Sequence, residues 1–237
     1  MIASSDRVRD EWLRRVEAEY RSAAITQHLV LWLIQIAASP DLIAMGLRIV
    51  KDELAHADLS FRTYRAAGGR AGPTLVRDTL GLTRHDHEPL EHDVALTCVE
   101  VFCLGETVAV PLFNQLRKEC STPAARRALD RVLRDEVRHR DFGWTLLPWL
   151  LDHPMGDSVR RLIDAELSSM LLRQRSSYAP PGADRETRIP PADRAWGLMP
   201  AARYGEVLTR AVERDYAPRF ARLGIDVRAA WQRSLAQ

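Results

Sequence analysis

Apolar side chains recur every three or four positions along most of this chain, which is the period of an amphipathic α-helix. The pattern predicts four long helices in the first 150 residues. Two further helices are predicted after Pro148, before a short C-terminal remainder. The sequence therefore predicts an all-α protein with helices at about 6–38, 40–67, 89–120, 123–147, 155–177 and 201–223.

Residues that begin or end helices separate these segments. Residues 39–41 (Ser-Pro-Asp) and 121–123 (Ser-Thr-Pro) each offer a capping side chain and a proline for the first helical turn. Either Ser4 or Ser5 is expected to cap the first helix. The two glycines at 68–69 are expected to end the second helix, because glycine readily adopts the left-handed conformation found there.

The connections between the first four helices follow the order short, long, short. The long one, residues 70–88, is rich in glycine, proline and charge. Short connections produce antiparallel neighbours, whereas a long one lets the third helix cross the bundle. We therefore expect residues 1–150 to form a four-helix bundle with one long central crossover. Residues 151–237 are expected to pack on it as accessory helices, with the Pro-rich stretch 178–200 as an ordered loop or lid.

The composition is that of a globular protein and argues against several functions. Hydrophobic residues make up 46% of the chain and charged residues 28%, and the net charge of +2 gives no positive field for nucleic acid. Three scattered cysteines and the lack of a secretory leader indicate a reducing cytoplasm. The longest apolar run, residues 29–38, is too short to span a bilayer. We therefore expect a cytoplasmic protein without nucleic-acid or membrane partners.

The most informative motif is Asp-Glu-x-x-His, which occurs at residues 52–56 and again at 135–139. Another Glu on an apolar helix precedes the Glu of each copy, by 34 positions in the first case and by 30 in the second. Because residues i and i+3 lie on the same side of a helix, the Glu and His of each copy face the same way. Four helices carrying these side chains inward would make a pocket for two metal ions. The predicted ligands are Glu19, Glu53, His56, Glu106, Glu136 and His139.

Buried carboxylates of this number need a counter-charge. Four of them together would resist ionisation, whereas two divalent cations balance their charge. Carboxylate and imidazole ligands favour iron, with manganese as the alternative. Glu53 and Glu136 are expected to bridge the ions, and each His to bind one ion as neutral imidazole. Glu17 and Glu100 are rival carboxylates, but helical geometry turns both away from the predicted ligand face.

Three other charged residues are candidates for a supporting role. Asp52 and Asp135 could each accept a hydrogen bond from a metal-bound His on a facing helix, and Arg138 could pair with one of them. The simpler interpretation of each is an exposed side chain. A second histidine cluster at residues 85–92 is interpreted as a polar loop rather than as a second metal site.

These motifs resemble those of the ferritin-like di-iron carboxylate superfamily over roughly residues 10–147. The segment around Glu19, Ser-Pro-Asp-Leu at 39–42 and the first Asp-Glu-x-x-His are similar to bacterial ferritin-like proteins. The doubled pattern resembles p-aminobenzoate N-oxygenase-like enzymes, and the copy at 135–139 resembles bacterial multicomponent monooxygenases. The resemblance implies a ferritin-like bundle, two iron ions and O2 as co-substrate. The chain departs from the N-oxygenases at Val132, where those enzymes carry a further His ligand.

By this resemblance the protein is expected to be an O2-dependent di-iron oxygenase or oxidase that acts on a small organic substrate. An amine nitrogen in a biosynthetic pathway is the favoured substrate class. An electron donor is expected as a partner, and a homodimer is left open. One alternative is an iron- or peroxide-handling protein of the ferroxidase or peroxidase type. Another is a non-enzymatic helical interaction protein whose metals are structural.

Overall fold

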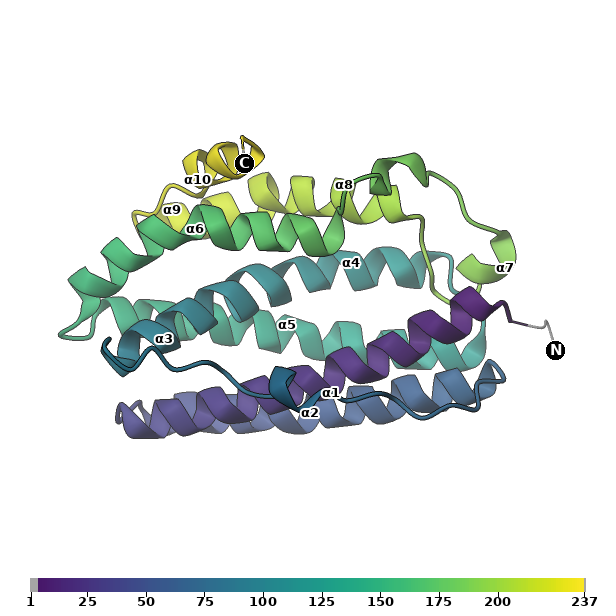
Figure 1. Ribbon diagram of the computed structural model, residues 1–237, viewed down its shortest axis with the longest axis horizontal. Coiled ribbons are helices and arrows are strands. Elements are labelled where there is room, and N and C mark those ends of the chain that lie inside the picture. Colours follow the sequence, from purple (N-terminus) through teal and green to yellow (C-terminus); the bar gives the residue numbers. More distant parts are fainter. Residues whose placement is uncertain (1–3, 237) are drawn as a thin grey trace. The chain divides into compact units, whose positions relative to one another are not determined.

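The computed structural model describes residues 4–236, and no strand occurs among them (Figure 1). The predicted all-α class is confirmed for this part of the chain. Two π-helical segments, η2 (Cys98–Glu106) and η4 (Val212–Tyr216), and two 3-10 turns, η1 (Arg77–Thr79) and η3 (Ala183–Arg185), accompany the α-helices. The α-helices are α1 (Asp6–Gln35), α2 (Pro40–Ala66), α3 (Leu90–Thr97), α4 (Thr107–Lys118), α5 (Pro123–Leu151), α6 (Gly156–Tyr178), α7 (Pro191–Arg194), α8 (Ala201–Ala211), α9 (Ala217–Arg222) and α10 (Val227–Leu235).

The chain divides into two compact units. The first comprises the described residues up to Thr83, with Phe113–Asp135 and Arg188–Met199. The second comprises Arg84–Leu112, Glu136–Thr187 and the described residues from Pro200 onward. The predicted division between 1–150 and 151–237 stays a prediction, and its outermost residues, 1–3 and 237, lie outside the described part.

In the first unit, α1 and α2 form an antiparallel pair and lie side by side (Figure 1). α1 ends at Gln35, before the predicted end, because Ala37 adopts a left-handed φ of +55° in the tight turn to α2. Ser5 caps α1 as predicted and accepts a hydrogen bond from the Val8 N–H at 3.2 Å. Ser39 occupies the N-cap position of α2 and a proline the first helical turn, as predicted, although the Ser39 side chain forms no capping hydrogen bond.

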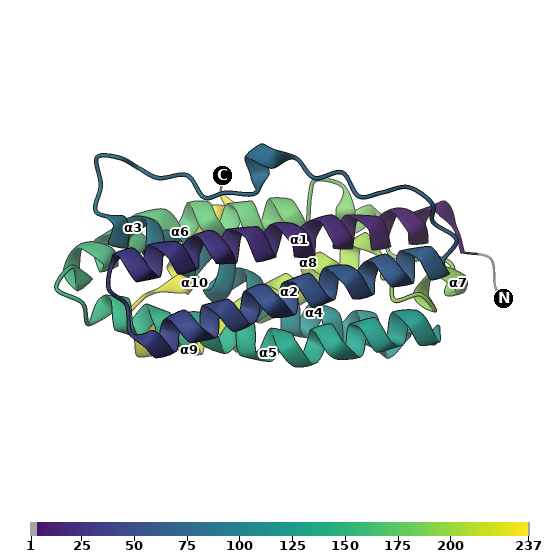
Figure 2. The same ribbon diagram turned by 90° about the horizontal axis from the view of Figure 1, so that it is seen from below.

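The long crossover between α2 and α3 runs along α1 (Figure 2). It begins at Gly68, where a φ of +88° ends α2 as predicted. Glu17 accepts a hydrogen bond from the Thr74 N–H at 2.7 Å, and His28 Nδ1 accepts one from the Leu82 N–H at 2.9 Å. Both α1 side chains therefore hold the crossover, and Glu17 is turned away from the predicted ligand face.

The second half of the predicted loop or lid, residues 188–199, packs within the first unit. Trp12 Nε1 on α1 donates a hydrogen bond to the Trp196 carbonyl at 3.1 Å, and Arg15 donates one to the Gly197 carbonyl at 3.1 Å. The Trp12 side chain is 1% exposed. This stretch is therefore anchored to α1 by buried hydrogen bonds, which the sequence pattern did not indicate.

In the second unit, the predicted helix 89–120 contains a π-helical segment of nine residues, η2, between α3 and α4. A π-helix changes the backbone hydrogen-bond pattern and is often found at functional sites. Two side chains donate hydrogen bonds to carbonyl groups of η2. The Tyr216 hydroxyl donates to the Leu104 carbonyl at 2.8 Å, and the Gln174 amide donates to the Glu100 carbonyl at 3.2 Å.

Prolines lie inside α4 and α5 rather than only at helix ends. Pro111 lies in α4, within the segment 89–120 that was predicted to be helical. Pro148 lies in α5, which runs on to Leu151, so the boundary predicted before this proline is wrong. Leu147 and Leu150 are fully buried, and their packing offsets the backbone hydrogen bond that a proline removes.

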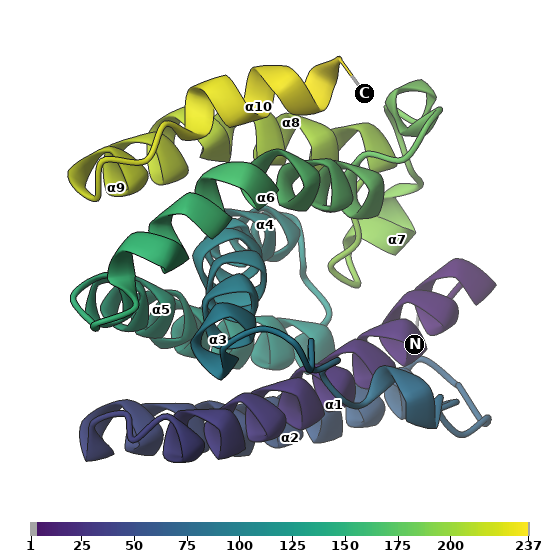
Figure 3. The same ribbon diagram turned by 60° about the vertical axis from the view of Figure 1, so that its left-hand side comes forward.

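The C-terminal helices of the second unit begin near their predicted positions. α6 packs beside α8 and α10 (Figure 3). The predicted segment 201–223 is formed by α8, η4 and α9 in succession, and it ends before Gly224, whose φ is +72°. α10 was not predicted, because its nine residues give too short a periodic pattern to separate from a loop.

Among the described helices, the stretch Leu90–Lys118 is long and apolar enough to cross a membrane, judged by length and composition alone. Half of its most apolar window is buried inside the protein. The core helix of a soluble protein has the same property, so the criterion does not discriminate between the two environments.

Candidate metal centre

α1 and α2 bring three potential metal ligands together in the first unit. Glu19 comes from α1, Glu53 and His56 come from α2, and one ligand atom of each lies within 4.8 Å of the other two. His56 Nδ1 is 3.6 Å from a Glu19 oxygen and 3.8 Å from a Glu53 oxygen. The three residues are 8%, 1% and 0% exposed, respectively. The i,i+3 spacing on α2 and the antiparallel α1–α2 packing together create this triad.

The electrostatics of this triad favour a positive charge within it. Burial raises the pKa of the Glu19 carboxyl to about 8, although His56 opposes the shift. Burial by itself lowers the pKa of the His56 imidazole, but Glu19 and Glu53 outweigh it and raise that pKa to about 11. The Glu19 carboxylate is therefore stabilised as an anion only beside a cation, which a protonated His56 or a metal ion supplies.

A carboxylate on α5 holds the other nitrogen of His56. The Nε2 atom lies 3.1 Å from Asp135 Oδ2. Arg131, one helical turn before Asp135, pairs with that carboxylate through Nε and with Asp52 at 3.3 Å. A carboxylate that accepts the N–H of a ligating imidazole fixes its tautomer and ring orientation. With Nε2–H directed to Asp135, Nδ1 is the nitrogen that faces the two Glu side chains.

Sequence reasoning missed Arg131, which bridges the two Asp residues of the repeated motif in the first unit. Its signal was the i,i+4 spacing to Asp135, which favours an ion pair on a helix. Arg138, the Arg that the sequence singled out, is half-buried on α5, and its predicted pairing stays a prediction.

The second unit contains the other triad. Glu106 is the last residue of η2, Glu136 and His139 lie on α5, and one ligand atom of each lies within 4.8 Å of the other two. His139 Nδ1 is 3.6 Å from a Glu136 oxygen. The residues are 9%, 3% and 0% exposed. Each unit thus brings together one single Glu and one Glu-x-x-His pair, which could hold a metal ion.

Close packing holds the segment that carries Glu106. A Cβ atom on Gly143 of α5 would lie 2.6 Å from Phe102 Cβ and 2.9 Å from the Phe102 carbonyl carbon, so only glycine fits at this approach. The Cys98 thiol donates a hydrogen bond to the Gly143 carbonyl at 3.5 Å. On its other side η2 accepts the hydrogen bond from Tyr216. These contacts fix the position from which Glu106 projects.

The rival carboxylate Glu100 lies on the same segment but forms a different contact. Its two oxygens accept hydrogen bonds from Arg173 of α6 at 2.5 and 2.9 Å, and both side chains are partly exposed. A surface ion pair explains this residue, in agreement with the prediction that it faces away from the ligands.

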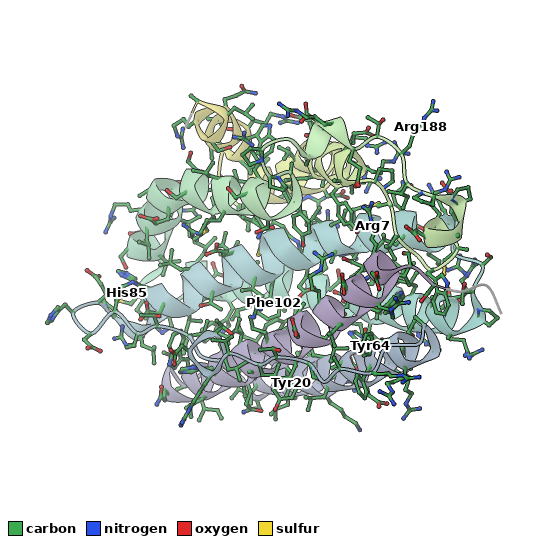
Figure 4. The ribbon with its side chains drawn as sticks, turned by 45° about the vertical axis from the view of Figure 1, so that its right-hand side comes forward. Arg7, Tyr20, Tyr64, His85, Phe102 and Arg188 are labelled. Carbon is green, nitrogen blue, oxygen red and sulfur yellow. The ribbon has the colours of Figure 1, made fainter. Side chains whose placement is uncertain are left out.

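The second histidine cluster is a hydrogen-bonded polar region around the start of α3 (His85 is labelled in Figure 4). His85 Nδ1 lies 2.5 Å from an oxygen of the buried Asp93. His92 contacts Glu88 through Nδ1 and the Ser158 hydroxyl through Nε2, each at 3.0 Å. These side chains anchor the end of the crossover to α3 and α6, in agreement with the interpretation as a polar loop.

Both triads have the chemistry of a site for a divalent cation. Each offers two carboxylates and one imidazole, a donor set that suits iron and manganese. The raised pKa of Glu19 shows that burial of the first triad disfavours the carboxylate unless a cation is near. The residues present therefore fit a resident metal ion in each triad.

No protein-family model, no curated protein and no solved structure matches this chain. The class of this protein therefore rests on its fold and its side chains alone. In the part of the chain described, it is an all-helical protein with buried Glu/His clusters that could hold metal ions.

Proposed function

We propose that the two triads form one dinuclear metal centre in a ferritin-like four-helix bundle made of α1, α2, the α3–α4 segment and α5. The order of ligands along the chain, Glu, Glu-x-x-His, Glu, Glu-x-x-His, supports this proposal, as does the long crossover in the middle.

The six ligands take distinct roles in this proposal. Asp135 and Arg131 would keep His56 in one orientation, with Nδ1 available to the metal. Iron is the proposed metal and manganese the alternative, because carboxylates and imidazoles suit both ions. The terminal carboxylates would be Glu19 and Glu106, the bridging carboxylates Glu53 and Glu136, and the imidazole ligands His56 and His139.

We infer that the centre serves O2-dependent oxidation of a small organic substrate. Two iron ions, when bound, supply electrons and coordination sites for dioxygen activation. The observation that carries this inference is that both clusters of carboxylates and imidazole are buried. Six side chains shared between two ions would leave coordination positions open on each ion, as in catalytic metal sites, whereas structural sites are closed by the protein. Burial excludes the water that would quench a reactive site.

The remaining parts of the proposal rest on the sequence resemblance. An amine nitrogen in a biosynthetic pathway is the proposed substrate class. The reaction would require an electron donor as a partner, and the proposed location is the cytoplasm. The alternatives are an iron- or peroxide-handling protein and a protein with structural metals.

Anaerobic loading with Fe(II), followed by mixing with O2 in a stopped-flow spectrometer, tests the proposal. The expected result is two irons per chain and a transient visible absorbance after mixing. Glu53→Gln and Glu136→Gln should lose both signals, because each variant removes a proposed bridging charge. Glu100→Gln is the matched control, because it changes a carboxylate on a surface ion pair and should keep both signals.

The outcomes separate the alternatives. Binding of fewer than two irons, or of two irons that do not react with O2, would refute the oxygenase proposal. Sustained turnover of Fe(II) or hydrogen peroxide without an organic substrate would favour iron or peroxide handling. Unfolding on metal removal, together with no reaction with O2, would favour a structural role.

A further inference from the structure

Large apolar side chains are exposed along the outer side of the α1–α2 pair. Their exposed fractions lie between 39% and 54%, although each belongs to a long, well-packed helix. A contiguous exposed apolar patch on a folded protein usually marks an interaction site. We call this patch the α1–α2 outer face, and it consists of Tyr20, Leu31, Ile34, Leu47 and Leu54.

Helical geometry places the exposed apolar side chains of α1 and those of α2 along the line where the two helices meet. Leu54 directly follows Glu53 and is turned about 100° from it, while the opposite flank of α2 meets Arg131 of α5. Leu54 therefore lies on the flank of α2 toward α1. Tyr20 directly follows Glu19 on α1, and in an antiparallel pair the same sense of turn directs it toward α2. Figure 3 shows the two helices side by side, and Tyr20 is labelled in Figure 4.

The spacing along this face is that of a helix-packing seam. Apolar residues on α2 recur at intervals of four, three, four and seven, and the members other than Leu47 and Leu54 are half-buried. On α1 the exposed apolar residues are separated by eleven and three positions, which keeps them on one side of the helix. Such a pattern buries its apolar residues only against another helical surface. On α2 the series is Ile43, Leu47, Val50, Leu54 and Phe61.

We propose that the α1–α2 outer face is the contact between two copies of this chain, related by a two-fold axis near Leu54. In a two-fold contact of antiparallel α2 helices, a residue before the axis meets a residue after it on the other copy. Lys51 precedes Leu54 by three residues and Asp58 follows it by four, on the same flank of α2. The axis therefore brings each lysine opposite the aspartate of the other copy.

The charges and the length of the face suit a two-fold contact. Lys51 is exposed, and Asp58 is exposed while pairing with Arg62 at 2.7 Å, so both side chains are accessible to a second copy. With 27 residues, α2 presents its side of the face over about 40 Å, while the crossover lies along α1 at Glu17 and His28. An apolar centre with a charged rim is also the usual interface composition.

Sedimentation velocity of the full chain over a wide concentration range tests this proposal. The expected species is a dimer. Leu54→Glu should weaken the dimer by a hundredfold or more, because it places a charge on the axis, against its own symmetry mate. Leu235→Glu is the matched control: that leucine is 47% exposed on α10 of the second unit and is not part of the face, and the variant should remain dimeric.

Charge reversal tests the position of the axis. Lys51→Glu should weaken the dimer by about tenfold or more, and adding Asp58→Lys in the same chain should restore it. All substituted side chains are exposed, so unchanged circular dichroism will show that the variants fold. A monomeric wild-type chain, or a dimer that tolerates Leu54→Glu, overturns the proposal. Failure of the double variant to restore the dimer overturns the two-fold arrangement.

Discussion

Replacement of Gly143 by alanine is the sharpest test of how α5 supports the π-helical segment η2. The added Cβ would lie 2.6 Å from Phe102 Cβ, 2.9 Å from the Phe102 carbonyl carbon and 3.0 Å from the Cys103 nitrogen. Carbon atoms in favourable contact are about 3.5–4.0 Å apart. Two of the three contacts are with backbone, so no side-chain rotation relieves them, and α5 or η2 must shift.

The magnitude follows from two opposing effects. Overpacking of a close helix contact costs about 1–3 kcal/mol, and more when backbone must move. Alanine in place of glycine within a helix stabilises by about 1 kcal/mol. We expect a net loss of about 2 kcal/mol in the free energy of unfolding. For a chain of this length that loss lowers Tm by about 4–8 °C.

Differential scanning calorimetry of the metal-free protein measures the loss, and Gly105→Ala is the control. Gly105 lies within η2 itself, but the nearest atoms to its added Cβ are the Glu100 oxygen at 3.5 Å and the Gln174 amide nitrogen at 3.9 Å, which are ordinary contacts. That variant should keep the wild-type Tm to within a few degrees. If Gly143→Ala is as stable as Gly105→Ala, the close approach of α5 to η2 does not exist as described.

Three further substitutions test other contacts. Tyr216→Phe should destabilise the protein by about 1–2 kcal/mol, because it leaves a buried carbonyl of η2 without its hydroxyl donor, and chemical denaturation measures this. Asp135→Asn should lower the affinity for metal by about 10–100-fold, because it weakens the orientation of His56, and competition with a chelator measures this with Arg138→Gln as a comparison. Gly197→Ala should destabilise by more than about 1 kcal/mol in thermal unfolding, because φ is +79° and the added Cβ meets an α5 side chain at 2.6 Å.

The helical content and the candidate ligands could be predicted from the sequence because both depend on local geometry. The i,i+3 spacing makes Glu53 and His56 share a face of α2 whatever surrounds the helix, and the same holds for the second copy of the motif. The cap at Ser5 and the glycine stop at Gly68 are likewise local, because they satisfy backbone groups within a few residues. The helix end predicted before Pro148 was wrong because the leucines around this proline are buried. Their tertiary packing outweighs the tendency of a proline to end a helix.

Only the tertiary structure decided which distant side chains meet. Arg131 lies between Asp52 and Asp135 because α2 and α5 pack together, and sequence separation carries no signal for such a contact. The π-helical segment that ends at Glu106 depends on side chains of later helices, which complete its hydrogen bonding. No local sequence pattern therefore predicts it. The sequence by itself determined the helices and the chemical identity of the ligands, since periodicity and side-chain type are local properties. The tertiary structure decided the orientation of the ligands and their support, since these come from packing between elements far apart in the chain.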